Sequence, residues 1–164
     1  MLGSSESIYQ GLKNSRINFI VSLPCINLAK LIELIEEDEE IQHVPVTREE
    51  EGIGVCAGAF LGKKRVAILM QNSGIGNSVN GLSSLTQLYS LPLIMIISHR
   101  GTEGEPIVGQ IPMGEITEDI LDTLKIQYFK PKTHEEAKEL VGKSWDLSSS
   151  KKSPVAFLFE ISYW

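Results

Sequence analysis

The fold is decided by residues 66–98, which read VAILMQNSGIGNSVNGLSSLTQLYSLPLIMIIS. The two ends of this stretch, Val66 to Met70 and Leu93 to Ser98, are apolar runs rich in β-branched residues, which is typical of buried strands. Between them, a Gly-rich turn leads into a helical pattern from Ile75 to Tyr89. Because a strand, a helix and a second strand in this order need a right-handed crossover, the stretch predicts two parallel strands of one sheet.

The same alternation continues in both directions along the chain. Further strands are predicted at Ile17 to Leu23, Ile41 to Val46, Gln127 to Phe129 and Val155 to Ile161. Helical patterns separate them at Ser5 to Lys13, Asn27 to Glu37, Arg48 to Leu61, Ile116 to Leu124 and His134 to Leu147. We therefore predict an α/β fold in which residues 1–164 form one domain, a flavodoxin-like, three-layer α/β/α sandwich around a mostly parallel sheet of about six strands.

Composition excludes several classes of function. The 164 residues carry a net charge of −6, whereas binding to a nucleic-acid backbone needs clustered positive charge. The only cysteines, Cys25 and Cys56, lie in apolar runs, which argues against a disulfide framework and a Cys-based zinc site. Met1 to Tyr9 has no signal-peptide pattern, and no apolar run reaches the ~20 residues that a membrane span needs. We expect a cytoplasmic protein with no nucleic-acid or membrane partner.

Three segments that each follow a predicted strand carry candidate functional residues. The first, Ser22-Leu23-Pro24-Cys25, contains a proline that forces an irregular exit from the strand. The second, Thr47 to Gly52, opens a helix with three consecutive glutamates, and Thr47 and Glu50 have the spacing of a capping box. The third, Met70 to Asn77, is a Gly-rich turn that presents free helix amides but matches neither the P-loop nor the dinucleotide-binding fingerprint.

The helix predicted after the second segment is built from small residues. It contains Gly52, Gly54 and Gly58, although glycine in a helix interior lowers stability. Something must therefore approach this helix closely. The sequence leaves three candidates open: the sheet, a neighbouring helix or a partner subunit.

In this order and spacing, the three segments resemble the pyrimidine-binding domain of thiamine-diphosphate-dependent decarboxylases. The resemblance covers nearly the whole chain and rests on Pro24, on the run from Glu50 through Gly52 to Ala57-Gly58, and on Met70-Gln71-Asn72-Ser73-Gly74-Ile75-Gly76-Asn77. It is closest to phosphonopyruvate and sulfopyruvate decarboxylases. The short length and the loop Ser98 to Thr102 are similar to the alpha subunits of the latter, which act in coenzyme M biosynthesis.

The resemblance implies roles for individual residues. In the family, the glutamate that opens the helix bonds the aminopyrimidine ring of thiamine diphosphate and promotes its imino tautomer. Counting back from Ala57 and Gly58 aligns Glu50 with this catalytic glutamate, while Glu49 and Glu51 remain alternatives. This role requires a carboxylate that shares a proton, which burial favours and a helix N-terminus opposes. The implied cofactor contacts are Pro24, Glu50, Asn72, Ser73, Gly74, Gly76 and Asn77.

One part of the family pattern is missing from this sequence. Members of the family hold the diphosphate through Mg²⁺, bound by a Gly-Asp-Gly segment and a later asparagine, and no Gly-Asp-Gly occurs here. We therefore predict no metal ligand in this chain. The resemblance implies instead a hetero-oligomer in which a beta subunit carries the domain that binds the diphosphate and Mg²⁺.

The segment His99 to Gly114 reads HRGTEGEPIVGQIPMG and is predicted to be a long loop. Such loops are usually functional when they follow the carboxyl end of a parallel strand. We assign contacts with a small anionic 2-oxo acid to Ser22, His99, Arg100 and Gln110, because a guanidinium matches the geometry of oxyanions. The alternative for Arg100 is an ion pair with Glu103 or Glu105.

The leading hypothesis is the decarboxylation of 3-sulfopyruvate to sulfoacetaldehyde and CO₂. Phosphonopyruvate or another anionic 2-oxo acid is the nearest alternative substrate. A different class of function is a non-catalytic, flavodoxin-like module that holds a phosphate-bearing ligand at Gly74 to Gly76, because one fold serves many functions.

Overall fold

A computed structural model describes residues 3–164. Met1 and Leu2, the start of the segment for which we predict no signal peptide, lie outside these residues. Six strands form one sheet in the order β2-β1-β3-β4-β6-β5. They are β1 (Phe19–Ser22), β2 (Gln42–Pro45), β3 (Val66–Gln71), β4 (Leu93–His99), β5 (Gln127–Phe129) and β6 (Pro154–Glu160). Every neighbouring pair is parallel, which confirms the predicted sheet.

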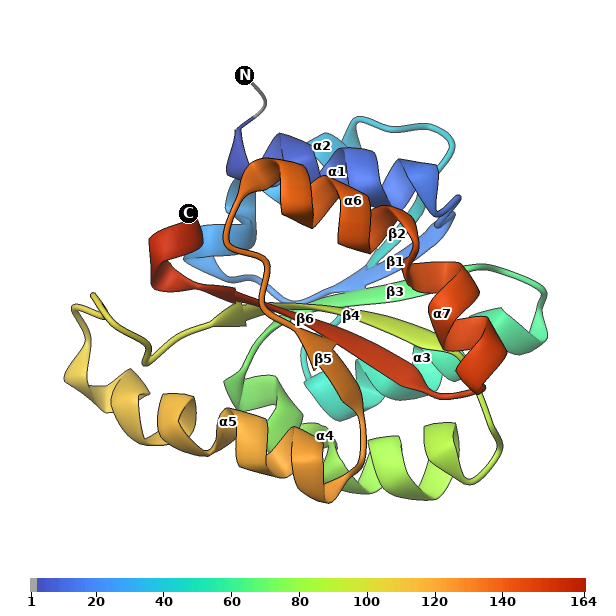
Figure 1. Cartoon of the computed structure of the whole chain (residues 1–164). Coiled ribbons are helices and arrows are strands. Elements are labelled where there is room, and N and C mark those ends of the chain that lie inside the picture. The colour runs from blue at the N-terminus through green and yellow to red at the C-terminus, as the bar shows by residue number, and fades with distance from the viewer. Residues whose placement is uncertain (1–2) are drawn as a thin grey trace.

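Helices cover both faces of the sheet, as predicted for a three-layer sandwich (Figure 1). One layer contains α1 (Ser4–Asn14), α2 (Ala29–Glu36) and α6 (His134–Gly142). The opposite layer contains α3 (Glu49–Leu61), α4 (Ser73–Gly81) and α5 (Ile111–Thr123). A shorter helix, α7 (Ser144–Lys151), follows α6 and packs against β4 and β6. Short 3₁₀ turns occupy Ile26–Leu28, Val108–Gln110 and Ile161–Tyr163.

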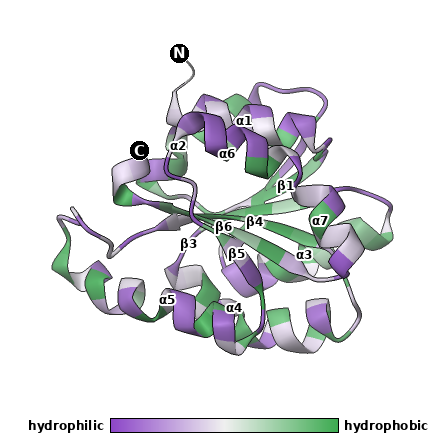
Figure 2. Ribbon diagram, viewed as in Figure 1, coloured by the Kyte–Doolittle hydropathy of each residue, from purple (hydrophilic) through white to green (hydrophobic). Residues whose placement is uncertain are grey.

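The core lies between the sheet and the two helical layers (Figure 2). All side chains of β4 and nearly all of β3 and β6 are buried, which explains why these strands are continuous apolar runs rather than alternating ones. The helices bury only one face. Within residues 3–164, no helix is both long enough and apolar enough to cross a membrane.

Three predicted helices differ from the observed ones. Helix α5 begins at Ile111 rather than Ile116, so the long loop is shorter than predicted. The helix predicted from Ile75 to Tyr89 begins at Ser73 and changes to a π-helical turn at Leu82–Gln87. The helix predicted from His134 to Leu147 is divided into α6 and α7 at Lys143.

The strand order creates a switch point between β1 and β3. These strands are neighbours, but the chain leaves β1 toward the layer of α2 and leaves β3 toward the layer of α4 (Figure 1). Loops that diverge in this way leave a crevice at the carboxyl edge of an open parallel sheet, where ligands of such folds bind.

Candidate functional site

The three candidate segments meet at this carboxyl edge. Pro24 follows β1, Glu50 lies in the first turn of α3 after β2, and Asn72 follows β3. Since β1 pairs with both β2 and β3, the ends of the three strands lie side by side. The sheet therefore brings together three segments that are separated in the sequence by a helix and a strand.

Glu50 has a carboxylate with one engaged and one unengaged oxygen. Its Oε1 accepts a hydrogen bond from Nε of Arg48 at 2.6 Å, whereas its Oε2 is buried and has no hydrogen-bond partner. Its own backbone N–H and the Arg48 guanidinium hold the pKa of the Glu50 carboxyl below its ordinary value. In this chain Glu50 is therefore ionised at neutral pH and has an oxygen available to accept a proton or a donor from a ligand.

The capping box predicted for Thr47 and Glu50 is wrong. Arg48 is the N-cap of α3, and no side chain caps the helix. The Thr47 hydroxyl instead lies 3.4 Å from Oε2 of Glu51, one turn further along. Glu50 is thus not used in capping.

The two alternative glutamates are placed differently from Glu50. Glu49 reaches across to α4, where its Oε2 accepts a hydrogen bond from Nδ2 of Asn77 at 2.9 Å. It packs so closely on Gly74 that a Cβ atom there would lie 2.3 Å from Cγ of Glu49. Glu51 is exposed. Glu50 is therefore the member of the glutamate run whose carboxylate combines a place at the sheet edge with an unpartnered buried oxygen.

Asn72 is completely buried and joins three elements. Its Nδ2 donates to the carbonyl oxygen of Arg100 and to Oγ1 of Thr117, and its Oδ1 accepts from the backbone N–H of Arg100. Both amide N–H groups are therefore used within the fold. In the same turn Ser73 is partly buried, and Gly76 and Asn77 are exposed.

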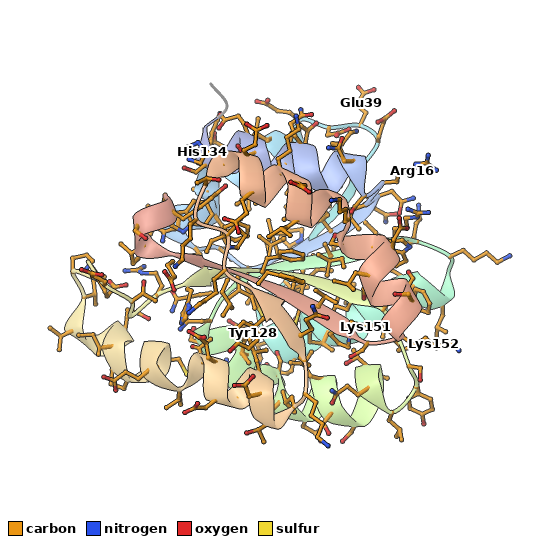
Figure 3. The ribbon with its side chains drawn as sticks, viewed as in Figure 1. Arg16, Glu39, Tyr128, His134, Lys151 and Lys152 are labelled. Atoms are coloured by element: carbon orange, nitrogen blue, oxygen red, sulfur yellow. The ribbon has the colours of Figure 1, made fainter. Side chains whose placement is uncertain are left out.

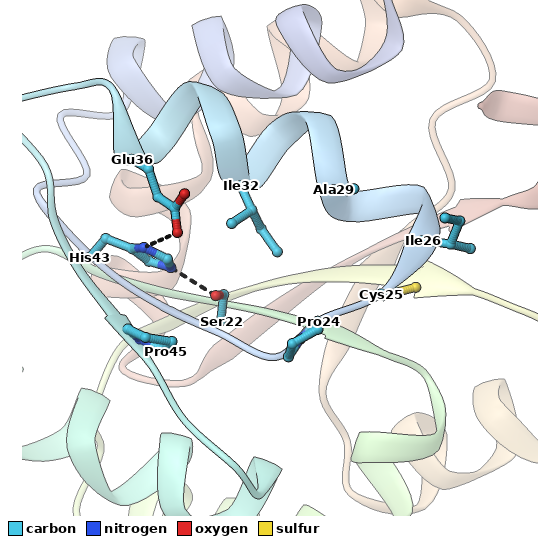
Figure 4. A pocket seen from close by; sticks show the side chains of 9 residues that line it. All are labelled: Ser22, Pro24, Cys25, Ile26, Ala29, Ile32, Glu36, His43 and Pro45. Atoms are coloured by element: carbon cyan, nitrogen blue, oxygen red, sulfur yellow. Dashed lines mark hydrogen bonds and ion pairs between the residues drawn. The ribbon is translucent and has the colours of Figure 1, made fainter.

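A cavity of about 500 Å³ opens between α2 and the ends of β1 and β2 (Figure 4). Its walls are mainly apolar and include Pro24, Cys25 and Ile32. Three polar side chains line it: Oγ of Ser22 is hydrogen-bonded to Nε2 of His43 at 2.7 Å, and Nδ1 of His43 lies 3.5 Å from Oε1 of Glu36.

Burial lowers the pKa of His43, so its imidazole is neutral at pH 7. The neighbouring Glu36 favours the tautomer with hydrogen on Nδ1, in which Nε2 accepts the hydroxyl hydrogen of Ser22. Ser22 then offers a ligand its lone pairs rather than a donor. His43 and Glu36 were not among the residues predicted from the sequence, although a histidine in a strand that ends at the edge of the site could have indicated them.

Arg100 forms the ion pair with Glu105 that was one of its two alternatives. Its Nε and a terminal nitrogen donate to the two carboxylate oxygens at 2.7 and 2.6 Å. The pair is buried, with side-chain exposures of 7% and 1%. The weak surface pair that the sequence suggested is thus a desolvated, bidentate one, and this guanidinium is not free for an anion.

The other two loop residues are also engaged in the fold. His99 is buried, its Nε2 bonds the carbonyl oxygen of Gly114 at 3.2 Å, and burial lowers its pKa. Oε1 of Gln110 accepts a hydrogen bond from Nε2 of Gln71 at 2.8 Å. The loop is therefore tied to the ends of β3 and α5.

Comparison with known proteins identifies the family of this chain. A family model described as thiamine pyrophosphate enzyme, N-terminal TPP binding domain, matches residues 4–126. Sulfopyruvate decarboxylase subunit alpha of Methanothermobacter thermautotrophicus is 53% identical over 98% of both chains. The protein of the same name from Methanococcus maripaludis is 48% identical over 99% of this chain and 98% of its own length.

A solved structure extends the comparison of folds. The 2-oxoglutarate:ferredoxin oxidoreductase from Magnetococcus marinus superimposes with a TM-score of 0.78 at 14% identity, over 99% of this chain but 29% of that one. At this identity the likeness shows the fold alone. The family model and the two relatives establish that this chain belongs to the thiamine pyrophosphate enzyme family and, within it, to the sulfopyruvate decarboxylase alpha subunits.

Proposed function

We propose that this chain forms one side of a thiamine-diphosphate site and that, with a beta subunit, it decarboxylates 3-sulfopyruvate to sulfoacetaldehyde and CO₂ in coenzyme M biosynthesis. The observation that carries the proposal is Glu50, whose buried Oε2 has no hydrogen-bond partner among residues 3–164. The two free cysteines fit a reducing compartment, so the proposal places the enzyme in the cytoplasm.

The residues at the sheet edge are chemically suited to the cofactor. Pro24 and Glu50 would contact its pyrimidine ring, and Ser73, Gly76 and Asn77 would line the adjoining turn. When bound, thiamine diphosphate supplies the electron sink that decarboxylation of a 2-oxo acid needs. Glu50 would hold and return a proton at its Oε2. Because its pKa is lowered in the lone chain, contact with the cofactor and exclusion of water have to raise it for proton sharing.

Three features support a partner subunit. The relatives are named as alpha subunits, and the sequence lacks the Gly-Asp-Gly segment through which the family binds Mg²⁺. In addition, the two guanidinium groups nearest the site, those of Arg48 and Arg100, are both paired with carboxylates. The proposal therefore assigns the Mg²⁺ ligands, and the positive charge that offsets an anionic substrate, to the beta subunit.

The outer face of α3 is the surface that we assign to the partner. Gly52 packs on the sheet, where a Cβ atom would lie 2.8 Å from Cδ1 of Ile68. A Cβ atom at Gly54 or Gly58 would instead meet nothing within 4 Å among residues 3–164 beyond its own stretch of helix. Beside them lie Leu61 and Tyr89, which are 73% and 66% exposed. The sheet is therefore the close neighbour of Gly52. For Gly54 and Gly58 we propose that the partner subunit is the close neighbour.

The test is turnover of 3-sulfopyruvate by the chain alone and by the chain with its beta subunit, thiamine diphosphate and Mg²⁺. We expect activity only in the complete mixture. Glu50→Gln should lower kcat by roughly 10²–10⁴-fold, because glutamine cannot share a proton, and should leave the melting temperature unchanged.

Glu51→Gln is the matched control, since its exposed carboxylate is one residue away, and it should retain activity. Turnover by the lone chain would refute the shared site. A Glu50→Gln enzyme that turns over normally would remove Glu50 from the mechanism.

A further inference from the structure

A cluster of ligand-forming side chains lies outside the site described above, between the ends of β4 and β6 and helix α5. One ring nitrogen of His99 and one carboxylate oxygen each from Glu118 and Glu160 lie within 4.8 Å of one another. His99 ends β4, Glu160 ends the neighbouring β6, and Glu118 faces them from α5. Two parallel strands and a helix thus direct three potential ligands toward one point.

The tautomer of His99 is fixed by its surroundings. A carbonyl oxygen can only accept, so the contact between Nε2 and Gly114 places the hydrogen on Nε2 and leaves the lone pair on Nδ1. Nδ1 is buried and has no partner, and His99 as a whole is 1% exposed. An unpaired lone pair inside a protein is costly unless a ligand satisfies it.

Lys130 now occupies the space between the carboxylates. Its Nζ lies 2.9 Å from Oε1 of Glu118 and 3.5 Å from Oε1 of Glu160, yet it makes no hydrogen bond to Nδ1 of His99. The other carboxylate oxygens have partners of their own. Oε2 of Glu118 accepts a hydrogen bond from the hydroxyl of Tyr128 in β5, which Figure 3 labels, and Oε2 of Glu160 accepts one from Lys132. The cluster therefore has supporting contacts of the kind that orient metal ligands.

We infer that His99, Glu118 and Glu160 form a binding site for a divalent transition-metal ion, which Lys130 closes when the ion is absent. One imidazole nitrogen and two carboxylate oxygens are a donor set that Zn²⁺ and Co²⁺ accept. Mg²⁺ prefers oxygen ligands alone and should bind this site poorly. Lys130 is able to leave, because its side chain is 35% exposed and flexible. This site is independent of the proposed function.

The test is a titration of the full chain, without thiamine diphosphate, with Co²⁺ and Zn²⁺ by calorimetry, together with the visible absorption of bound Co²⁺. We expect one ion per chain. Removing the competing ammonium in Lys130→Met should tighten binding by about tenfold, because apparent affinity falls with the fraction of molecules in which the site is open. Glu118→Gln should weaken binding by about tenfold or more.

Matched controls come from a second Glu–Lys pair on the surface. Lys143 and Glu139 form an exposed ion pair, so Lys143→Met and Glu139→Gln change the same residue types without touching the cluster. Both should bind Co²⁺ like the wild type. Absence of saturable binding in both wild type and Lys130→Met would overturn the site, as would equal weakening by Glu118→Gln and Glu139→Gln. If wild type and Lys130→Met bind Co²⁺ with equal affinity, the inference that Lys130 closes the empty site is wrong.

Discussion

Arg100 and Glu105 show how burial changes the meaning of a single charged residue. An ordinary ion pair at the surface contributes little to stability, whereas removing one partner of a buried pair leaves an uncompensated charge. We therefore expect Arg100→Met to lower the free energy of unfolding by about 3–5 kcal/mol. Chemical denaturation measures this, with Lys143→Met of the exposed pair as a control that should change stability by at most about 1 kcal/mol.

The kinetic consequence separates the two roles of Arg100. If its guanidinium serves the fold, Arg100→Met lowers kcat/KM for sulfopyruvate and for pyruvate by the same factor. A loss confined to sulfopyruvate, in a variant of normal stability, would return Arg100 to the substrate site.

Glu105 makes stability depend on pH in a defined range. The Arg100 guanidinium, helped by the backbone N–H groups of Gly101 and Ile107, holds the pKa of Glu105 down to about 2, although burial acts in the opposite direction. A carboxyl whose pKa is lower in the folded state stabilises the fold above its unfolded pKa and loses this effect as the pH falls through its folded pKa. Glu105→Gln should therefore be clearly less stable than wild type at pH 7.

The difference should shrink as the pH falls from about 4.5 toward 2. Denaturation midpoints of the two proteins across this range are the measurement. A difference that does not change with pH would mean that the pair contributes packing rather than charge.

At the scale of elements, the strands were predictable from sequence and the start of α5 was not. The strands β3, β4 and β6 are apolar runs that are buried on both faces, whereas the edge strands β2 and β5 are short and only partly buried. The start of α5 contains Pro112 and Gly114, which signal a loop, but proline is tolerated in a first turn. Gly114 is explained only by three-dimensional contact, because a Cβ atom there would lie 2.6 Å from Cα of Gly101.

The contact between Gly101 and Gly114 fastens the loop after β4 to α5. Gly101 has a φ of +80°, and a Cβ atom there would lie 2.3 Å from the carbonyl oxygen of Gln110. Gly101→Ala combines this steric conflict with an unfavourable backbone conformation, so it should lower stability by about 2–4 kcal/mol.

Gly109→Ala in the same loop is the control, because nothing lies within 4 Å of its Cβ position. Thermal unfolding of both variants measures the effect. Equal melting temperatures would show that the loop moves away from α5 at little cost.

At the scale of the whole molecule, the sheet brings together the segments of the site. These segments could be identified from the sequence, but the contacts between their side chains could not. The family resemblance placed Pro24, Glu50 and the turn after β3 at one edge, and the parallel order of β2, β1 and β3 makes them neighbours. The sequence does not show which of the three glutamates has an unpaired oxygen, because this depends on the directions of the side chains and not on their spacing. The hydrogen bonds between Glu49 and Asn77 and between Asn72 and Thr117 likewise depend on side-chain directions.

The exposure of the outer face of α3 was likewise not predictable, although its small residues could be identified from the sequence. Leu61 and Tyr89, both largely exposed, border a cavity of about 470 Å³ that is also lined by Ala57, Leu85 and Leu91. Contiguous apolar surface of this kind on a chain of net charge −6 is typical of a protein interface rather than of a free surface. We therefore expect the isolated chain to self-associate and the beta subunit to suppress this by covering the face.

Leu61→Asp should abolish both kinds of association, because it places a charge where the partner would remove water. Lys143→Asp, an equally exposed change far along the chain, should leave association intact. Sedimentation velocity of each variant, alone and with the beta subunit, distinguishes the outcomes. A wild-type chain that is a monomer and gains no thermal stability from the beta subunit would rule out this face as the interface.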